Sequence, residues 1–303
     1  MVEPAIRFEG VTKRFDDVEA LRGLDLSVEP GEIFGFLGPN GAGKTTAIRI
    51  MFDLIRPTSG HVAVLGHDAQ SAGIEVRRAA THLPSDAAFY ESMSANGYLD
   101  LIASIRGNGV DRAWRGRLIE RLELDPSRRI GTLSRGNRQK VGIVAALMSR
   151  PALVVLDEPT SGLDPIMQET VEAILREVAG EGTTVFFSSH VLAEVEQLCS
   201  RVAMLRLGQV VRVIDLAEER LVAPRQVEVT FAEAPARAAL EGVAGAPLTS
   251  LDGVRATFET RDGIDALVKR LAEFTLVRLE THEPSLEEIF LTYYGEAAAG
   301  DAA

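Results

Sequence analysis

The chain has 303 residues, of which 46% are apolar and 25% are charged, a composition typical of a soluble globular protein and unlike that of a disordered chain. The length is about twice that of a common single domain, which favours two domains. The formal net charge of −12 disfavours binding of nucleic acid or anionic lipid by the surface as a whole.

Neither a membrane span nor a secretory leader is predicted. The longest nearly unbroken apolar run, Val141 to Met148, is too short to cross a bilayer. The start of the chain, Met1 to Phe8, has no long apolar stretch, so a cytosolic location is expected. The one cysteine, Cys199, lies beside Val195 and Leu198 in a helical pattern, and we expect it to be an apolar filler without a function.

The first 55 residues predict a strand pair, a buried strand, a glycine loop and a helix. Apolar residues alternate with polar ones from Ile6 to Val11 and from Leu24 to Val28, as in an antiparallel pair. Ile33 to Leu37 is a continuous apolar run of the kind found in central strands, and the glycine-rich stretch Gly38 to Gly43 follows it. Helical spacing then holds from Ile48 to Ile55.

The middle of the chain predicts a helical insert followed by a parallel sheet. The pattern is mostly helical from Met93 to Met148. Two further buried strands are predicted at Leu153 to Leu156 and Thr184 to Phe187, with a helix around Val171 to Val178 between them. Strand, helix and strand in alternation imply a parallel sheet.

A second, small domain is predicted after a polar stretch at Asp215 to Pro224. Residues 221 to 303 hold 14 acidic and 7 basic residues, which disfavours a nucleic-acid module. The predicted order is βαββαβ, a ferredoxin-like split unit. Its elements are a strand at 226–231, a helix at 234–240, strands at 247–250 and 254–258, a helix at 264–274 and a strand at 276–281.

The glycine loop matches the phosphate-binding pattern G-x-x-x-x-G-K-[ST], with the predicted strand before it and the helix after it. Its glycines let backbone amides converge on phosphates, Lys44 adds a cation, and the Thr45 hydroxyl suits Mg²⁺. A plain glycine turn is the alternative, but only four lysines occur in the chain, so a chance match is improbable. The residues concerned are Gly38, Pro39, Asn40, Gly41, Ala42, Gly43, Lys44, Thr45 and the following Thr46.

Two carboxylates follow the next buried strand and precede Pro159. At the end of a strand beside the phosphate loop, Asp157 suits Mg²⁺ held through water, and Glu158 suits activation of the attacking water. Two solvated acids at a strand end are the alternative, which would not explain the wholly apolar run before them.

Between these two motifs, Leu133 to Asn137 reads LSRGN, and Ser134 is a natural N-cap for the helix that follows. In this order the motifs make residues 5 to about 215 resemble an ATP-binding-cassette (ABC) ATPase. LSRGN corresponds to the signature loop, LVVLDEP to the Walker B strand, SGLD at 161–164 to the D-loop, and His190 to the switch histidine.

The resemblance implies an α/β P-loop cassette at 1–217 with a mixed sheet, an antiparallel subdomain and a helical subdomain at about 90–150. It implies two cassettes paired head to tail, as a homodimer or with another cassette. Each ATP with its Mg²⁺ then lies between one P-loop and the other subunit's signature helix. An accessory or regulatory domain at 221–296 and a flexible tail at 297–303 complete this prediction.

The resemblance also assigns roles to single residues. Ser134, Gly136 and Asn137 act in trans, and Asp164 of the D-loop adds to the nucleotide site. His190 hydrogen-bonds the γ-phosphate, although a lone histidine at a strand end is more often a surface or core residue. Phe15 corresponds to the aromatic that stacks on adenine, with a core position near Phe8 as the alternative. The resulting list is catalytic Glu158, His190 and Lys44, and metal-binding Thr45, Asp157 and Ser85.

Two positions depart from the family. Ser85 stands where a glutamine usually contacts Mg²⁺ and the permease, and its hydroxyl is too short for that reach. We expect a bridging water or Asp86 to take the place of the glutamine. Arg135 and Asn137 replace the usual glycine and glutamine of the signature loop, and the asparagine keeps an amide.

The whole-chain plan resembles ATP-binding subunits of drug-resistance and antibiotic exporters, including a tail with Glu283 to Phe290. This implies a permease encoded by a separate polypeptide and a place at the cytoplasmic face of the membrane. An importer subunit is the nearer alternative. A soluble ABC-type ATPase acting on nucleic acid or ribosomes is disfavoured by the charge and by the lack of a long coiled coil or of a second cassette.

Overall fold

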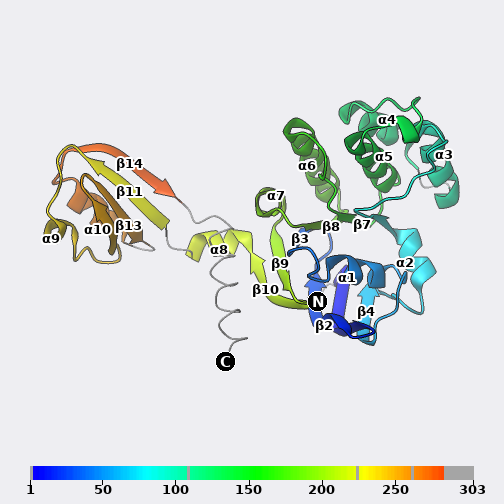
Figure 1. Cartoon of the computed structure of the whole chain (residues 1–303), viewed down its shortest axis with the longest axis horizontal. Coiled ribbons are helices and arrows are strands. Elements are labelled where there is room, and N and C mark those ends of the chain that lie inside the picture. The colour runs from blue at the N-terminus through cyan, green and yellow to red at the C-terminus, as the bar shows by residue number, and fades with distance from the viewer. Residues whose placement is uncertain (1–2, 108–109, 223–224, 261–262, 283–303) are drawn as a thin grey trace. The chain divides into compact units, whose positions relative to one another are not determined.

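The computed structural model describes residues 3–107, 110–222, 225–260 and 263–282. Contacts divide the chain into two units, Met1–Ile214 and Asp215–Ala303, whose helices and strands are labelled in Figure 1. A separate hydrophobic core lies in each unit. The predicted tail at 297–303 and the segment Glu283 to Phe290 lie outside the described residues.

The first unit is built on a six-stranded sheet in the order β10-β9-β3-β8-β7-β6. The pairs β3/β8, β3/β9, β7/β8 and β6/β7 are parallel, which confirms the predicted parallel sheet. β3, β7 and β8 are buried at every position, as their continuous apolar runs predict. The strands are β3 (Ile33–Leu37), β6 (Ala80–Leu83), β7 (Leu153–Asp157), β8 (Thr184–Ser189), β9 (Arg201–Arg206) and β10 (Gln209–Asp215).

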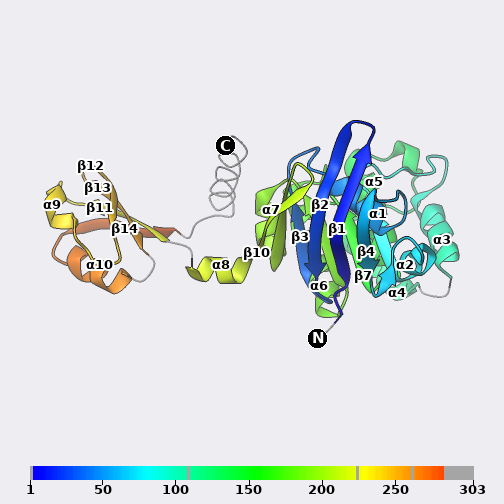
Figure 2. The ribbon, with the colours of Figure 1, turned by 90° about the horizontal axis from the view of Figure 1, so that it is seen from below.

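A four-stranded sheet, β2-β1-β4-β5, forms a second layer of this unit. Figure 2 shows β1 and β2 as two long neighbouring strands, and their pairing is antiparallel as predicted. Apolar side chains from both sheets share one core, in which Phe34 of β3 stacks on Phe186 of β8. The strands are β1 (Ile6–Phe15), β2 (Val18–Val28), β4 (Ser59–Val64) and β5 (His67–Asp68).

Helices pack around these sheets, and the predicted helical insert is confirmed. Figure 1 shows α3, α4 and α5 gathered on one side of the unit, where the buried Trp114 of α4 donates to the carbonyl of Leu147 at 3.0 Å. No described helix is long and apolar enough to span a bilayer. The helices are α1 (Lys44–Met51), α2 (Gly73–Ala79), α3 (Ala95–Arg106), α4 (Arg112–Arg121), the 3-10 turn η1 (Ile130–Thr132), α5 (Arg135–Leu147), α6 (Pro165–Gly180) and α7 (Leu192–Leu198).

The second unit has the predicted βαββαβ order, and its antiparallel sheet runs β12-β13-β11-β14. The helix predicted from residue 234 begins at Arg237, because the residue before Pro235 is disfavoured in the helical region. The elements are α8 (Leu216–Val222), β11 (Arg225–Phe231), α9 (Arg237–Leu240), β12 (Leu248–Asp252), β13 (Arg255–Thr260), α10 (Ile264–Leu271) and β14 (Leu276–His282).

Gly38, at the start of the loop that follows β3, lies very close to the backbone of a neighbouring strand. A Cβ at Gly38 would lie 2.5 Å from the carbonyl oxygen of Leu205 on β9. We expect Gly38→Ala to lower the free energy of unfolding by about 1 to 3 kcal/mol, because overpacking forces the backbone to shift.

Gly180 provides the control, since a Cβ there meets no atom within 4 Å and its position is helical. Gly180→Ala should be neutral or slightly stabilising. Urea unfolding of both variants measures the difference, and equal stabilities would contradict the packing argument.

Candidate nucleotide-binding site

A cavity of about 270 Å³ lies at the carboxyl ends of β3 and β7, where parallel α/β sheets commonly bind ligands. It brings together most of the predicted phosphate-loop residues with both predicted carboxylates and Ser85. Ala20 of β2 also lines it, although no motif in the sequence marks this residue. The lining residues are Ala20, Pro39, Asn40, Gly41, Gly43, Lys44, Thr45, Thr46, Ser85, Asp157 and Glu158.

The loop from β3 to α1 has the backbone shape that a phosphate cradle requires. Gly41 and Gly43 have φ angles of 80° and 107°, which favour glycine. Gly43 is the N-cap of α1, so the free amides of the first helical turn face the cavity mouth. Ala42 differs, since its side chain is buried and its amide donates to the carbonyl of Pro39 at 3.1 Å.

Lys44 is buried and lies across this loop. Its ammonium donates to the carbonyls of Gly38 and Pro39. Burial lowers the pKa of Lys44, and the charges of Glu158 and Asp157 oppose that shift. A desolvated cation held among amides favours a ligand with several negative charges.

Three oxygen-bearing side chains from different segments line one part of the cavity. The Thr45 hydroxyl donates to Asp157 Oδ2 at 2.9 Å, and the Asp157 side chain is almost fully buried at the end of β7. Ser85 also lines the cavity, whereas Asp86 lines a different hollow and is exposed. A carboxylate with two hydroxyls is an all-oxygen donor set of the kind that suits Mg²⁺.

Glu158 is held in an unusual backbone conformation directly after β7. Its φ of 52° lies in the left-handed region, which costs a non-glycine residue on the order of 1 to 3 kcal/mol. The surrounding contacts hold it there: its amide donates to the Ser188 carbonyl at 2.9 Å, and its own carbonyl accepts from Gln139 Nε2 at 3.2 Å. Its carboxylate lies 2.9 Å from His190 Nδ1, so the structure brings together two predicted catalytic residues.

The predicted signature residues begin α5 and contact the D-loop of the same chain. Ser134 is the N-cap and accepts from the Asn137 amide at 3.3 Å. A Cβ at Gly136 would lie 2.6 Å from the Gly162 carbonyl, so this close approach requires glycine. Arg135 donates to the Ser161 hydroxyl at 2.9 Å. Sequence reasoning missed both this contact and the role of the buried Gln139.

Several predicted residues do not line the cavity of their own chain. They are Phe15, Gly38, Ala42, Ser134, Gly136, Asn137, Asp164 and His190. Phe15 is 44% exposed, which excludes its alternative as a core residue. Asp164 is the N-cap of α6 and accepts from the Met167 amide at 3.0 Å. Ser134 is also exposed, so its hydroxyl and the helix end remain accessible to another molecule.

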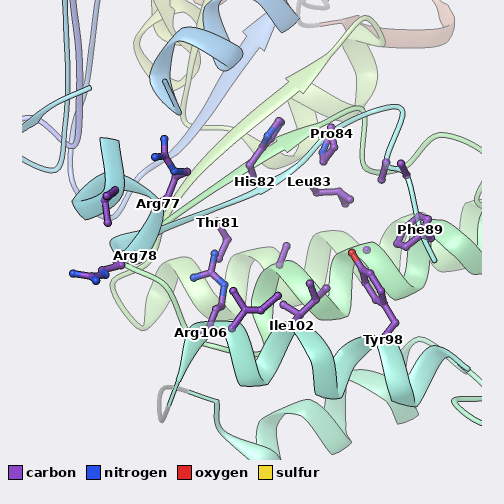
Figure 3. A pocket seen from close by; sticks show the side chains of 17 residues that line it. Arg77, Arg78, Thr81, His82, Leu83, Pro84, Phe89, Tyr98, Ile102 and Arg106 are labelled. Atoms are coloured by element: carbon purple, nitrogen blue, oxygen red, sulfur yellow. The ribbon is translucent and has the colours of Figure 1, made fainter. Parts of the chain in front are cut away.

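A larger cavity of about 720 Å³ lies between β6 and the helices α2, α3 and α5, and sequence reasoning did not find it (Figure 3). Figure 3 shows three arginines on one side, Arg77, Arg78 and Arg106, and the aromatic rings of Tyr98 and Phe89 on the other. Leu83 and Pro84 line this cavity, while the next residue, Ser85, lines the first one.

This combination of strand ends, glycine loop and paired carboxylates defines an ATP-binding cassette. Residues 21–161 match the protein family described as ABC transporter. The chain belongs to the ABC transporter family as an ATP-binding subunit with an ATPase domain.

Two curated relatives and one solved structure illustrate the match. The daunorubicin resistance ATP-binding protein DrrA3 of Streptomyces coeruleorubidus is 38% identical over 216 residues, 70% of this chain and 68% of that protein. The daunorubicin/doxorubicin resistance ATP-binding protein DrrA of Streptomyces peucetius is 32% identical over 308 residues, 97% of this chain and 93% of that protein. A structure described as the ATP binding subunit of an ABC transporter is 27% identical with a TM-score of 0.66, covering 71% of this chain and 92% of that one.

His82 of β6 generates a pH prediction. Burial lowers its pKa to about 4, its ring stacks on Phe52 with centroids 5.1 Å apart, and its Nε2 has no hydrogen-bond partner among the described residues. A histidine held neutral in the folded state is protonated more readily after unfolding. Stability is therefore lost as pH falls from the ordinary value near 6.5 toward 4.

At pH 5 this histidine should cost roughly 2 kcal/mol of unfolding free energy relative to pH 7. His82→Phe keeps the stacked ring without the titrating group, so its stability should fall less over the same range. Urea unfolding at the two pH values measures both proteins. Equal losses of unfolding free energy in the two proteins would show that the pKa of His82 is the same in the folded and unfolded states.

Proposed function

We propose that this ATPase works as a head-to-tail dimer that drives export through a separate membrane permease. One observation supports the dimer above all others. The exposed N-terminus of α5, with Ser134, does not line the cavity that holds Lys44 and Asp157 in the same chain. In a head-to-tail pair, the helix of one subunit completes the cavity of its partner, and its free amides face the γ-phosphate.

Within each cavity the phosphate loop binds the nucleotide. The amides at Gly41 and Gly43 and the Lys44 ammonium bind the β- and γ-phosphates, and the exposed Phe15 stacks on adenine. Thr45 and Asp157 hold Mg²⁺, with Ser85 beside them in the place of the usual glutamine. When bound, Mg²⁺ offsets the negative charge of the phosphates.

Glu158 and His190 act on the reacting groups. The left-handed conformation at residue 158 directs the carboxylate away from the strand, where it orients the attacking water and accepts its proton. His190 contacts Glu158 through Nδ1, which leaves Nε2 for the γ-phosphate oxygen. Asp164, which lies in the loop after Glu158, contributes to the nucleotide site.

The permease contact is assigned to the larger cavity. It is wide, partly apolar and joined to the nucleotide site by one short segment, Leu83 to Ser85. A permease helix that binds in the larger cavity and displaces Pro84 therefore also moves Ser85, which lies beside the metal site. Contact with a permease at this surface places the subunit at the cytoplasmic face of the membrane. Export, of a drug or antibiotic, is favoured because relatives are named for daunorubicin resistance and for bacitracin transport.

Replacement of Glu158 by glutamine tests the hydrolytic step. The amide keeps the size of the side chain but cannot take a proton, so ATP turnover should fall by roughly 10²- to 10⁴-fold. ATP affinity should stay within a few fold, because the phosphate loop is intact. Steady-state phosphate release and nucleotide binding measure the two effects. Unchanged turnover would remove Glu158 from the mechanism.

The trans arrangement is tested with two inactive variants. Lys44→Ala damages the cavity, and Ser134→Arg blocks the helix N-terminus that the partner uses. Each variant should be inactive alone, whereas a mixture should regain activity, because one of the two sites in a heterodimer combines an intact Lys44 with an intact Ser134. Activity per monomer should also rise with protein concentration. A flat dependence and an inactive mixture would mean that each chain hydrolyses ATP alone.

A further inference from the structure

The outer strand β14 of the second unit has an open edge. It pairs with β11 on one side, and no other described strand pairs with it (Figure 1). An edge strand presents a row of backbone donors and acceptors that a further strand can pair with. Proteins commonly protect such an edge with charged side chains or cover it with another segment. The side chains of β14 indicate whether its edge is protected by charge or is suited to being covered.

Two large apolar side chains are exposed on β14. Val277 is 70% exposed and Leu279 is 44% exposed. Leu279 pairs with the buried Val229 of β11, so its side chain lies on the face of the sheet that carries the core. Val277 falls at a register shift in this pairing, between Leu276 and Arg278. At the opposite edge, the two leucines of β12 are only half-exposed. Exposed apolar side chains at residues 277 and 279 are therefore a feature of one edge.

The charged residues lie on the other face of β14. Arg278 and Glu280 form an ion pair at 2.6 Å within the strand. Glu280 also stands directly opposite Glu228 of β11, and like charges in this position destabilise a sheet. A second cation opposite Glu280 on its open side would offset this repulsion.

We propose that β14 pairs antiparallel with β14 of a second copy of this chain, with Leu279 on the two-fold axis. In this register the Arg278 of each copy lies opposite the other copy's Glu280, and Val277 opposite Thr281. The two Leu279 side chains meet at the centre, and the exposed Val277 of each copy lies two residues away along its strand. A two-fold interface uses the same residues on both sides, which this self-complementary order satisfies.

The charges select this register. Centring the pair on residue 278 would place two arginines opposite each other, and centring it on residue 280 would place two glutamates opposite each other. Each cross-strand pair contributes about 0.2 to 1 kcal/mol, so a few of them bias the register without making the contact permanent. Joined edges would also keep two cassettes together between ATP-dependent encounters, through a higher effective concentration. The edge contact itself does not depend on the proposed nucleotide sandwich.

Cysteine cross-linking tests the register in the full chain. The native Cys199 is buried, and burial raises the pKa of its thiol, so it reacts poorly. Leu279→Cys places two thiols opposite each other and should give a covalent dimer rapidly without nucleotide. Val277→Cys is the matched control: it is more exposed, but its copies lie on the order of 13 Å apart in this register and should cross-link far more slowly. Equal rates would contradict the register.

Charge exchange provides a second test. Arg278→Glu and Glu280→Arg each place like charges across the interface, and either should weaken nucleotide-free dimerisation about tenfold or more. A mixture of the two restores opposite charges at every pair and should dimerise as tightly as wild type. Sedimentation in EDTA measures this and excludes a cation bridging Glu228, Glu280 and His282, whose ligand atoms lie within 4.8 Å of one another.

Three results would overturn the proposal. They are a wild-type chain that is monomeric at all concentrations without nucleotide, a charge mixture that does not recover, and β14 amides that are protected from hydrogen exchange in the monomer. The last result would mean that residues 283–303 of the same chain cover the edge. Loss of ATP-dependent dimers alone, with the nucleotide-free dimer intact, would count against the sandwich and leave the edge contact standing.

Discussion

The proposed hydrolytic chemistry depends on the backbone at Glu158, which is held in a left-handed conformation between β8 and α5. The amide of Glu158 is bonded to Ser188 and its carbonyl to Gln139, so a strained residue is fixed from two sides. Such strain is tolerated where surrounding contacts outweigh its cost. Because of it, Asp157 remains buried beside Thr45 while the next side chain reaches His190. Two adjacent carboxylates thereby acquire different environments.

The same contacts join the proposed catalytic residues to α5, which begins with the predicted signature residues. Gln139 lies one turn after the N-terminus of α5, and Gly136 and Arg135 contact the loop at Ser161 and Gly162. In a head-to-tail dimer, the N-terminus of α5 would contact the partner's nucleotide, while Gln139 of the same helix holds Glu158 of its own chain. A change at one nucleotide site would then reach the other through a few short polar contacts. α5 and the loop it contacts are closely packed, so they have few alternative arrangements. The segment Leu83 to Ser85 gives the larger cavity a similar short route to the first.

Long apolar runs and glycine motifs made much of the fold predictable. The runs at β3, β7 and β8 identify central strands, and the phosphate loop follows from the position of Gly38 to Lys44 after one of them. Several other strands of the first unit were not predicted. β4 begins at Ser59, inside a stretch that reads as a turn, and β6 has only four residues. Contacts between distant segments leave no local pattern, which explains why Gln139, Ala20 and the larger cavity were missed.

In the proposed dimer, each γ-phosphate lies between the phosphate loop of one subunit and the α5 N-terminus of the other. Vanadate occupies the γ-phosphate position after hydrolysis, and ultraviolet irradiation of the trapped complex cleaves the backbone nearest to it. Cleavage should occur at two places, within Gly38 to Thr45 and at Ser134, and both should be lost when Glu158→Gln prevents trapping. Cleavage confined to the phosphate loop of a fully trapped protein would mean that the α5 N-terminus does not reach the γ-phosphate.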